Sequence, residues 1–412
     1  MAALQPVRGT QDLLPDAYRR HRAVAETARH IAERFGYQEI ATPIFEFTEV
    51  FARPIGETTD IVSKEMYTFQ DRGGEEITLR PEYTAGIVRA VMSNGLTQSL
   101  PLKFFAAGPM FRYERPQKGR FRQFHQIDVE LIGAAQPSAD IELIALGAEI
   151  LGALGVLKHT VLELNTLGDT ASRHAYRAAL VGYYGKHRDA LSEDSRRRLD
   201  TNPLRILDSK DAGDKRINAE APNFADYLTP EAKEFFAEVC AGLAVLGIGY
   251  VLNPRLVRGL DYYCHTAFEF ITTSLGAQGT VLGGGRYDGL MGVMGGPQTP
   301  GVGWAAGIER LMMLANEPAP SPRPVALVPL GEAAERKALV LARDLRRRGV
   351  PVELDYKGNM KRRLQRANKV NARAAVILGD NELAKGVAAL KDLDKGEQKE
   401  VPLGQLAEML AS

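Results

Sequence analysis

The sequence predicts two domains of mixed α and β structure: a larger, sheet-based domain at residues 1–320 and a small α/β domain at residues 321–412. The proline-rich stretch 315–323 marks the boundary between them. Residues from about 168 to 238 contain many arginines and few strand signals, which indicates a helical insertion within the larger domain. After the proline-rich stretch, apolar runs alternate with amphipathic segments, as in a small α/β fold.

The first elements follow from hydrophobic periodicity and from the positions of turn residues. They are expected as a helix at 17–36, a strand at 37–40, a helix-and-loop stretch that ends in a turn at 72–74, a strand at 77–79 and a helix at 84–92. Two strands at 103–110 and 124–132 are separated by a charged loop. Their spacing predicts an antiparallel hairpin whose loop reaches outward.

The second half of the larger domain continues this pattern. We expect helices at 137–154, 171–184 and 230–243, a strand at 266–271, and a short segment at 301–304 that runs into a helix at 306–314. Gly283, Gly284 and Gly285 are expected in a tight turn. The small domain should hold strands at 325–329, 350–354 and 375–378 and helices at 332–348 and 360–374, with a largely parallel sheet.

Composition excludes several classes of protein. Hydrophobic residues make up 45% and charged residues 25% of the 412 residues, values ordinary for a globular protein and unlike a disordered one. The only two cysteines, Cys240 and Cys264, cannot build a disulfide framework or a zinc site, which predicts a reducing compartment. Neither a signal peptide nor an apolar run long enough to span a membrane is evident, so a cytoplasmic location is expected.

Charge is unevenly distributed along the chain. The net charge is +1, but the part from Arg323 onward has roughly 18 basic against 12 acidic residues, which leaves the larger domain slightly acidic. This asymmetry predicts that the small domain meets a polyanion, although surface lysines and arginines are common.

Residues 256–263 (Leu-Val-Arg-Gly-Leu-Asp-Tyr-Tyr) are the densest group of hydrogen-bonding side chains. Strand alternation would place Arg258 and Tyr262 on one face and Asp261 and Tyr263 on the other. Such groups are costly to bury without partners, so a polar ligand is expected. The alternative is an ion pair of Arg258 with Asp261 at a strand end.

The loop at 111–124 has five cations around one carboxylate. Arg112 and Glu114 are two residues apart and so share a strand face, where Arg112 can bind a phosphate and Glu114 can accept from an exocyclic amine. Phe124 could stack on a purine. The loop therefore predicts a nucleotide site, with a solvated basic loop as the alternative.

A further cation, Arg310, follows the glycine-containing segment 301–307, where the backbone can approach a ligand closely. Neither a Walker A sequence nor a Gly-x-Gly-x-x-Gly after a strand is present, so the P-loop and Rossmann interpretations fail.

Together these segments resemble class II aminoacyl-tRNA synthetases. Residues 111–114 with a downstream arginine are similar to motif 2, residues 301–310 to motif 3, and Thr42-Pro43 with its preceding helix to motif 1, which lies at that family's dimer interface. Residues 256–263 and 284–288 are similar to two segments peculiar to histidyl-tRNA synthetase. Residues 8–15 and 78–82 also match that family. The resemblance covers essentially the whole chain.

The resemblance implies a six-stranded antiparallel sheet flanked by helices, followed by an α/β anticodon-binding domain. It implies a homodimeric histidine–tRNA ligase that activates L-histidine with ATP and Mg²⁺ to histidyl-adenylate, releases pyrophosphate and transfers the acyl group to tRNA-His. No resident metal is expected. The resemblance also assigns roles to individual residues: Arg112 and Arg258 at the α-phosphate; Glu114 and Phe124 at adenine; Arg120 and Arg310 at the outer phosphates; Glu82, Thr84 and Gln126 at the α-amino group; Glu130 and Tyr263, with Tyr262 beside it, at the imidazole; Arg115 and Gln117 at the tRNA acceptor end.

One departure from the family pattern concerns Tyr83, which stands where the family often has a small residue. Its bulky side chain could reshape the substrate pocket or point away from it.

In the small domain, four cations fall at i, i+4, i+7 and i+11, which predicts one basic stripe on a helix: Arg362, Arg366, Lys369 and Arg373. The stripe either contacts tRNA phosphates or is a solvated face. The main alternative to a ligase is the family's non-catalytic relative, the regulatory subunit of ATP phosphoribosyltransferase, which lacks the anticodon-binding domain and several active-site groups that this chain has. A third alternative is an RNA-binding or signalling protein with a relict synthetase core.

Overall fold

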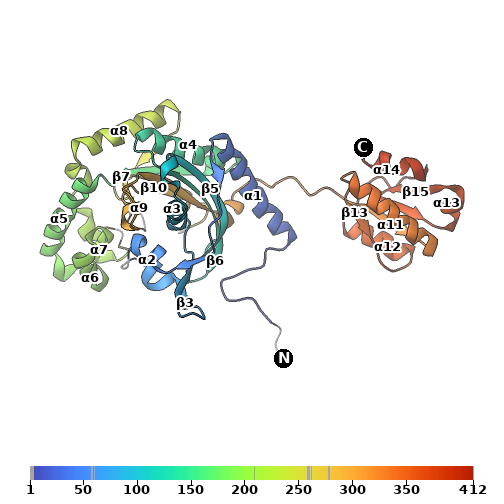
Figure 1. Cartoon of the computed structure of the whole chain (residues 1–412), viewed down its shortest axis with the longest axis horizontal. Coiled ribbons are helices and arrows are strands. Elements are labelled where there is room, and N and C mark those ends of the chain that lie inside the picture. Colours follow the sequence, from blue (N-terminus) through green and yellow to red (C-terminus); the bar gives the residue numbers. More distant parts are fainter. Residues whose placement is uncertain are drawn as a thin grey trace. The chain divides into compact units, whose positions relative to one another are not determined.

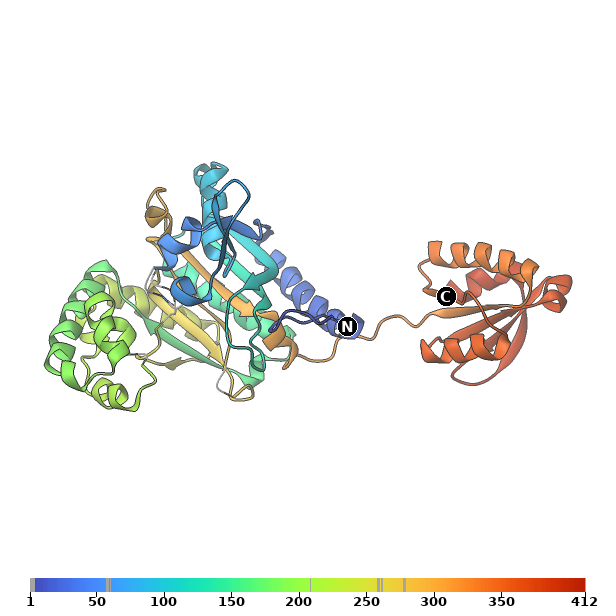
Figure 2. The same cartoon turned by 90° about the horizontal axis from the view of Figure 1, so that it is seen from below.

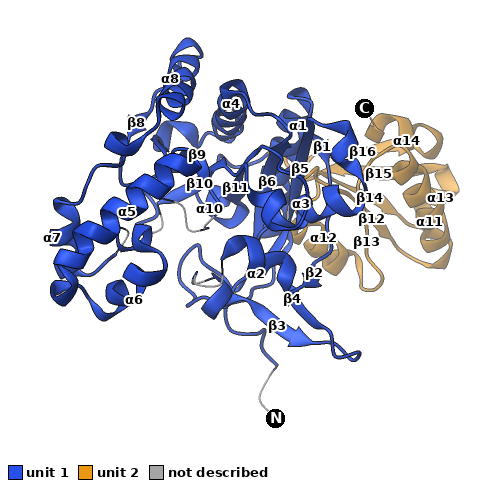
Figure 3. Cartoon of the chain, turned by 60° about the vertical axis from the view of Figure 1, so that its left-hand side comes forward, with its two compact units in different colours: residues 1–318 blue, residues 319–412 orange. Residues whose placement is uncertain are grey.

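The computed structural model describes residues 4–56, 59, 61–207, 209–257, 260, 262–276 and 279–411. The chain divides into two compact units, residues 1–318 and 319–412 (Figure 3). The division falls inside the proline-rich stretch 315–323. None of the described helices is long and apolar enough to cross a membrane.

The first unit is organised around an eight-stranded sheet. Its strands lie in the order β1 (Gln38–Glu39), β5 (Leu102–Phe111), β6 (Gln123–Ile132), β11 (Gly301–Gly307), β10 (Thr280–Arg286), β9 (Cys264–Ile271), β7 (Val161–Thr166) and β8 (Val251–Leu252). The six central strands are antiparallel, and the short β1 and β8 pair in parallel at the two edges. The expected antiparallel sheet and the hairpin of β5 and β6 are therefore confirmed.

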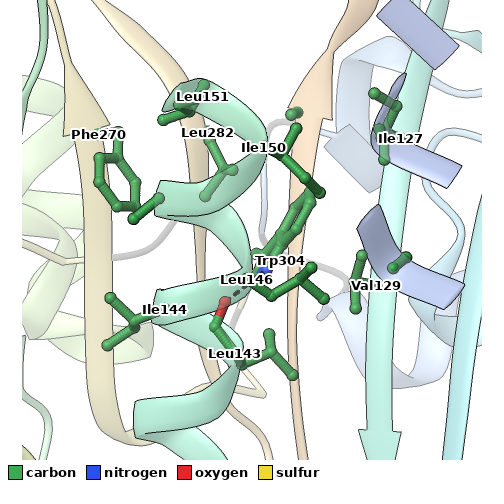
Figure 4. Close-up of a cluster of buried hydrophobic side chains, with 14 of the residues drawn as sticks. Ile127, Val129, Leu143, Ile144, Leu146, Ile150, Leu151, Phe270, Leu282 and Trp304 are labelled. Carbon is green, nitrogen blue, oxygen red and sulfur yellow. Dashed lines mark hydrogen bonds between the residues drawn. The ribbon is translucent and has the colours of Figure 1, made fainter. Parts of the chain in front are cut away.

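One face of this sheet carries the main hydrophobic core. It is covered by α1 (Pro15–Arg34), α4 (Pro137–Ala153), α8 (Pro230–Val245) and α10 (Ile308–Met312). Leu143, Ile144 and Leu151 of α4 pack against Phe270 and Leu282 of the sheet (Figure 4). Because buried apolar surface stabilises at roughly 25 cal/mol per Å², this layer provides much of the driving force for folding.

Trp304 of β11 is buried in the same layer and donates from its indole nitrogen to the Leu143 carbonyl over 2.9 Å (Figure 4). This bond ties α4 to the middle of the sheet and satisfies a polar atom that would be costly to bury alone.

The other face of the sheet is covered at one side by short elements. These are α2 (Glu49–Ile55), α3 (Thr84–Ser93) and α9 (Leu290–Val293). A separate three-stranded antiparallel sheet of β2 (Phe45–Phe47), β4 (Glu76–Leu79) and β3 (Tyr67–Gln70) contacts α2. The predicted helix-and-loop stretch before residue 72 was wrong for β2 and β3, because neither short segment alternates clearly enough to reveal a strand.

Helices dominate residues 168–238, as predicted. The helices α5 (Thr170–Lys186), α6 (Glu193–Thr201) and α7 (Ala212–Ala219) share a separate core that includes Tyr176, Leu180 and Tyr184, and they form the green group at the left of Figure 1. α8 instead packs against α4.

The second unit is a five-stranded sheet between two layers of helices (Figure 2). Its strands lie in the order β13 (Val352–Leu354), β12 (Val325–Pro329), β14 (Ala374–Leu378), β15 (Val387–Asp392) and β16 (Gln398–Pro402), and its helices are α11 (Glu332–Arg347), α12 (Met360–Lys369), α13 (Asp380–Lys385) and α14 (Leu403–Ala411). The first three strands are parallel, but β15 and β16 are antiparallel. The expectation of a largely parallel sheet missed this hairpin, whose short turn needs no crossover helix.

Two further predictions were wrong for the same physical reason. Gly283, Gly284 and Gly285 do not form a tight turn but lie within β10, and β11 continues to Gly307, where a helix from 306 was expected. A Cβ on Gly284 would collide with the Gly303 carbonyl, and one on Gly285 with the Thr266 carbonyl. The glycines therefore reflect closely packed strands rather than a turn.

Candidate active site

A cavity of about 270 Å³ lies over the sheet face opposite the main core, above β6, β11 and β10. Its floor consists of small residues, because Gly283, Ala305 and Gly307 stand where larger side chains would fill the space. Alternation along β6 directs Phe124, Gln126, Asp128 and Glu130 to this same face. β6 thus carries polar and aromatic side chains at every second residue on the face of the sheet that borders the cavity.

Glu82 is held rigidly at the start of α3. Its carboxylate accepts hydrogen bonds from the backbone N–H groups of Thr84 (2.9 Å) and Ala85 (2.8 Å), and the Tyr262 hydroxyl donates to it over 3.4 Å. Burial raises the pKa of this carboxyl, although these donors and the charge of Arg112 act in the opposite direction. Glu82, Thr84 and Tyr262 all line the cavity.

Glu130 is fully buried beneath the same region. One carboxylate oxygen accepts from the Thr84 hydroxyl over 2.6 Å and the other from the Tyr287 hydroxyl. Burial raises the pKa of Glu130 to about 8. A Cβ on Gly303, the residue opposite on β11, would collide with this carboxylate, so glycine is required there.

Two acceptors between these acids lack protein partners. Asp128 is 1% exposed, and its Oδ2 has no hydrogen-bond partner among the described residues; the same holds for Oε1 of Gln126. Both residues line the cavity. Burial, together with the neighbouring charges of Glu130 and Glu82, raises the pKa of Asp128 well above its ordinary value.

The cations predicted to bind phosphate gather at the same cavity. Arg112, Arg120 and Arg310 all line it. The Arg112 guanidinium lies 5.2 Å from the centre of the Phe124 ring and donates from Nε to the Pro81 carbonyl over 2.9 Å. Arg310 donates to the carbonyls of Thr280 (2.7 Å) and Gly119 (3.2 Å).

Burial and the charge of Arg120 lower the pKa of Arg310, so an anion near Arg310 is favoured electrostatically. Glu114 lines the cavity and forms an ion pair with Arg120. Because this carboxylate already has a cationic partner in the ligand-free protein, a bound nucleotide would have to share or replace that pair.

The segment 256–263 differs from the prediction. Leu260 lies in a bend and Tyr262 in a turn rather than in a strand, so the expected alternation does not apply. Tyr262 and Tyr263 both line the cavity, with ring centres 4.7 Å apart. Arg258 and Asp261 lie outside the described residues. The predicted contact of Arg258 with the α-phosphate and the alternative ion pair of Arg258 with Asp261 therefore stay predictions.

Three residues near the site take positions that the sequence did not specify. Tyr83 is buried in the core, with the Arg80 guanidinium 4.3 Å from its ring centre, and is not among the described residues that line the cavity. It therefore points away from the substrate space. Tyr287, which was not predicted as a site residue, reaches Glu130. Arg286 beside it is fully buried and paired with Asp140.

The loop between β5 and β6 contributes Gly119 and Arg120 to the cavity, but not all of its predicted residues. Arg115 and Gln117 are exposed and are not among the described cavity-lining residues. The backbones of Gln117 and Arg120 pair across a turn that contains Gly119, whose φ of 71° is a conformation that glycine adopts most readily.

The basic stripe of the second unit is shorter than predicted. Arg362, Arg366 and Lys369 are exposed on α12, and Arg366 pairs with Glu353 at 2.9 Å. Arg373 does not belong to the stripe. The helix ends at Lys369, Asn371 has a φ of 53°, and the Arg373 guanidinium donates to the Leu410 carbonyl.

Among the described residues, one group has atoms placed for holding a metal ion: His21, His125 and Glu309, with ligand atoms within 4.8 Å of one another. Glu309 accepts from the backbone N–H of His125 (2.9 Å) and lies 2.8 Å from its ring Nδ1. These contacts join β6 to α10, which carries Arg310.

Comparisons with known proteins agree over the whole chain. The family model described as histidyl-tRNA synthetase matches residues 9–311, and an anticodon binding domain matches residues 324–412. Proteins named histidine–tRNA ligase are 61% identical in Rhodospirillum rubrum and 59% identical in Gluconacetobacter diazotrophicus, covering 100% of this chain and 99% of each relative.

Solved structures give the same result. The ligand-free histidyl-tRNA synthetase of S. aureus has a TM-score of 0.85 and 36% identity, with full coverage of both chains. A structure from Bacillus halodurans, described as an ATP phosphoribosyltransferase regulatory subunit/histidyl-tRNA synthetase, has a TM-score of 0.67 and 22% identity, covering 92% of this chain and 99% of that one. At that identity the likeness shows the fold alone.

Proposed function

The chain belongs to the histidyl-tRNA synthetase family and is an ATP-dependent histidine–tRNA ligase, and we propose that histidyl-adenylate forms in the cavity above β6. The observation that carries this proposal is the meeting of opposite charges in one space. Arginines 112, 120 and 310 line the same cavity as the carboxylates of Glu82 and Asp128. A triphosphate and an amino acid's ammonium group need this combination.

The first step joins the histidine carboxylate to the α-phosphorus of ATP, and the bond to pyrophosphate breaks. The carboxylate is already ionised, so the protein needs no general base. Catalysis rests on positioning and on stabilising charge at the phosphate oxygens. Arg112 and Arg258 take this role at the α-phosphate, and Arg120 and Arg310 hold the outer phosphates. In the second step the tRNA 3′ hydroxyl attacks the acyl carbon and AMP leaves.

Adenine binds against Phe124, with Glu114 accepting from its exocyclic amine. The basis is the order of groups along the cavity: Phe124 stacks near Arg112, which anchors the adjacent phosphate. ATP enters as its Mg²⁺ complex. Glu309 lines the cavity one residue before Arg310 and offers carboxylate oxygens, the ligand type that Mg²⁺ prefers, and the ion offsets phosphate charge.

Histidine binds at the other end of the cavity. Glu82, Thr84 and Gln126 receive the α-amino group, while Glu130 and Tyr263, with Tyr262 beside them, recognise the imidazole. Support comes from the hydrogen-bonded chain from Tyr262 through Glu82 and from Thr84 through Glu130 to Tyr287. An amino acid without imidazole donors and acceptors would leave buried polar groups unpaired, which can reject rivals by roughly 10⁴–10⁵.

tRNA contacts lie outside the cavity. The exposed Arg115 and Gln117 suit guanine edges and phosphates at the acceptor end, and Arg362, Arg366 and Lys369 suit phosphates near the anticodon. Because tRNA, ATP and histidine meet in the cytoplasm, that is the proposed location.

A homodimer is proposed from the three-stranded sheet of the first unit. Phe45, Phe47 and Phe69 point to one face of this sheet, and each is about half exposed. Exposed aromatic side chains on one sheet face are typical of a protein interface. The sheet follows Thr42-Pro43, the motif 1 segment.

The test is pyrophosphate exchange with ATP and Mg²⁺ across a panel of amino acids. Histidine alone should support exchange, and Arg258→Ala should abolish it while histidine binding, measured by calorimetry, stays nearly unchanged. Substantial residual turnover in Arg258→Ala would remove Arg258 from its role. Exchange with a second amino acid would contradict the imidazole assignment.

A further inference from the structure

Asp128 is a buried carboxyl group that lines the cavity and has one oxygen without a partner among the described residues. The side chain lies on β6 and is 1% exposed, and its Oδ2 has no hydrogen-bond donor among the described residues. Ionised carboxylates are costly to bury unless they are paired or hydrogen-bonded. A group in this state that lines a ligand cavity is placed to receive a donor from the ligand.

Each carboxylate oxygen of the two neighbouring acids already accepts a hydrogen bond within the protein. Both Glu82 oxygens accept backbone N–H groups of α3, and both Glu130 oxygens accept hydroxyl groups, from Thr84 and Tyr287. These two carboxylates are built into the scaffold before a substrate arrives. Of the three acids, Asp128 is the one with a buried oxygen that accepts no hydrogen bond from the described residues.

A second unpartnered acceptor lies beside it. Gln126 stands two residues earlier on β6 and therefore on the same face, and its Oε1 also lacks a partner among the described residues. Two adjacent acceptors call for a group that only donates. An ammonium has three N–H donors, no acceptor and a full positive charge, and it meets each of these requirements.

We propose that Asp128, next to Gln126, binds the α-ammonium group of the histidine substrate and so helps to select an amino acid over its deaminated analogue. This inference rests on the proposed histidine site in the cavity. The imidazole is the weaker candidate for Asp128, because it is largely neutral at pH 7 and cannot balance a buried negative charge. Arg112, a nearby cation, is assigned to the α-phosphate. The substrate's ammonium group therefore supplies the positive charge that pairs with Asp128.

The experiment compares three ligands by isothermal titration calorimetry: L-histidine, L-histidinol, which keeps the amine, and imidazole-4-propionate, which lacks it. Asp128→Asn keeps the shape and removes the charge. Since a hydrogen bond to a charged group is worth a factor of about 10–100 in affinity, we expect that loss for histidine and histidinol. Imidazole-4-propionate should change by less than about threefold.

Stability separates this role from a structural one. Replacing a buried carboxyl group whose Oδ2 has no partner among the described residues should leave the melting temperature of the ligand-free enzyme unchanged or higher, whereas loss of a structural contact would lower it. Asp128→Ser, which is smaller and cannot overpack, is measured alongside in case Asp128→Asn does not fold. Asp344→Asn, on the exposed surface of α11, is the control and should affect neither binding nor melting.

Three results would overturn the proposal: histidine affinity unchanged in both Asp128 variants, equal losses for all three ligands, or a lowered melting temperature that accompanies the loss. Failure of the underlying site has a different signature. There the wild-type enzyme binds imidazole-4-propionate as tightly as histidinol, or histidine binding survives when the cavity is blocked by a bulky Ala305→Trp substitution.

Discussion

The two units use charge in opposite ways. In the first unit, charged groups are buried and fixed: Arg286 and Asp140 are both inaccessible, and Asp128 and Glu130 lie under the cavity. In the second unit, Arg362, Arg366 and Lys369 project from an exposed helix face. Buried charges interact strongly with nearby charges because the protein interior has a low dielectric constant. Interactions between exposed charges are weaker and are screened by salt. The first arrangement suits chemistry on small molecules, and the second suits a large polyanion.

The largest expected effect is on stability in the first unit. Asp140→Ala removes the fully buried partner of Arg286 and leaves it only the partly exposed Asp288, which should lower the free energy of unfolding by about 3–5 kcal/mol. The single tryptophan, Trp304, is buried in this unit, so its fluorescence during urea denaturation measures the unfolding of the first unit.

The control for this change is Glu49→Ala, which breaks an exposed pair with Arg53 in the same unit. Exposed pairs contribute about 0–1 kcal/mol. If the two variants lose similar stability, burial does not determine how much each ion pair contributes.

The second prediction concerns catalysis. Arg112→Ala should lower the rate of histidine-dependent pyrophosphate exchange by about 10²–10³, because one donor to the developing phosphate charge is lost. Arg115→Ala, three residues away but exposed and outside the cavity lining, should change exchange by less than about threefold. Comparable losses in both variants would mean that the whole loop, rather than the cavity side of it, carries the reaction.

The third prediction concerns pH. Burial raises the pKa of Glu130 to about 8 from 4.5, so in the folded protein this carboxyl keeps its proton where the unfolded chain has lost it. The unfolded state binds fewer protons between these values, and the stability of the ligand-free enzyme should therefore fall as pH rises from about 4.5 to 8. Glu130→Gln should flatten this slope in urea denaturation followed at several pH values. An unchanged slope would assign the pH dependence to other buried acids.

The smallest effects are expected on the exposed stripe. Arg362→Ala or Lys369→Ala should weaken tRNA binding only a few-fold at low salt, and should reduce the slope of log affinity against log salt by about one per cation that contacts a phosphate. Filter binding at several salt concentrations measures this, with Arg336→Ala on α11 as the control. Pyrophosphate exchange without tRNA should be unaffected. A salt slope identical to wild type would identify the stripe as a solvated face.

The site was predictable where function depends on residue type and local spacing. Arg112, Glu114 and Phe124 were identified from their residue types and Gln126 from the family resemblance, and the structure brings all four to one cavity. The predicted shared strand face was wrong for Arg112 and Glu114, because β5 ends at Phe111 and both residues lie beyond it. The prediction failed where backbone geometry depends on distant neighbours. Leu260 lies in a bend and Tyr262 in a turn rather than in a strand, and the Arg373 guanidinium donates to the Leu410 carbonyl instead of joining the stripe.

Asp128 and Tyr287 show a different limit. Asp128 lies on the same period as Gln126 and Glu130, and this spacing was the one signal that could have identified it. Tyr287 lies in the family-specific segment 284–288, but that segment did not reveal that its hydroxyl contacts a carboxylate 157 residues away.

By itself, the sequence determined the class of the protein: the two-domain order, the strand that presents the functional row, and the cations and acids that a synthetase requires. Those features depend on composition, periodicity and short motifs, which are local properties of a chain. Only the tertiary structure decided which carboxylates are already satisfied, which remains open to a ligand, and which glycines are forced by a neighbouring strand. Such questions concern contacts between residues far apart in the chain, and pairwise contacts of that kind leave no periodic trace in a single sequence.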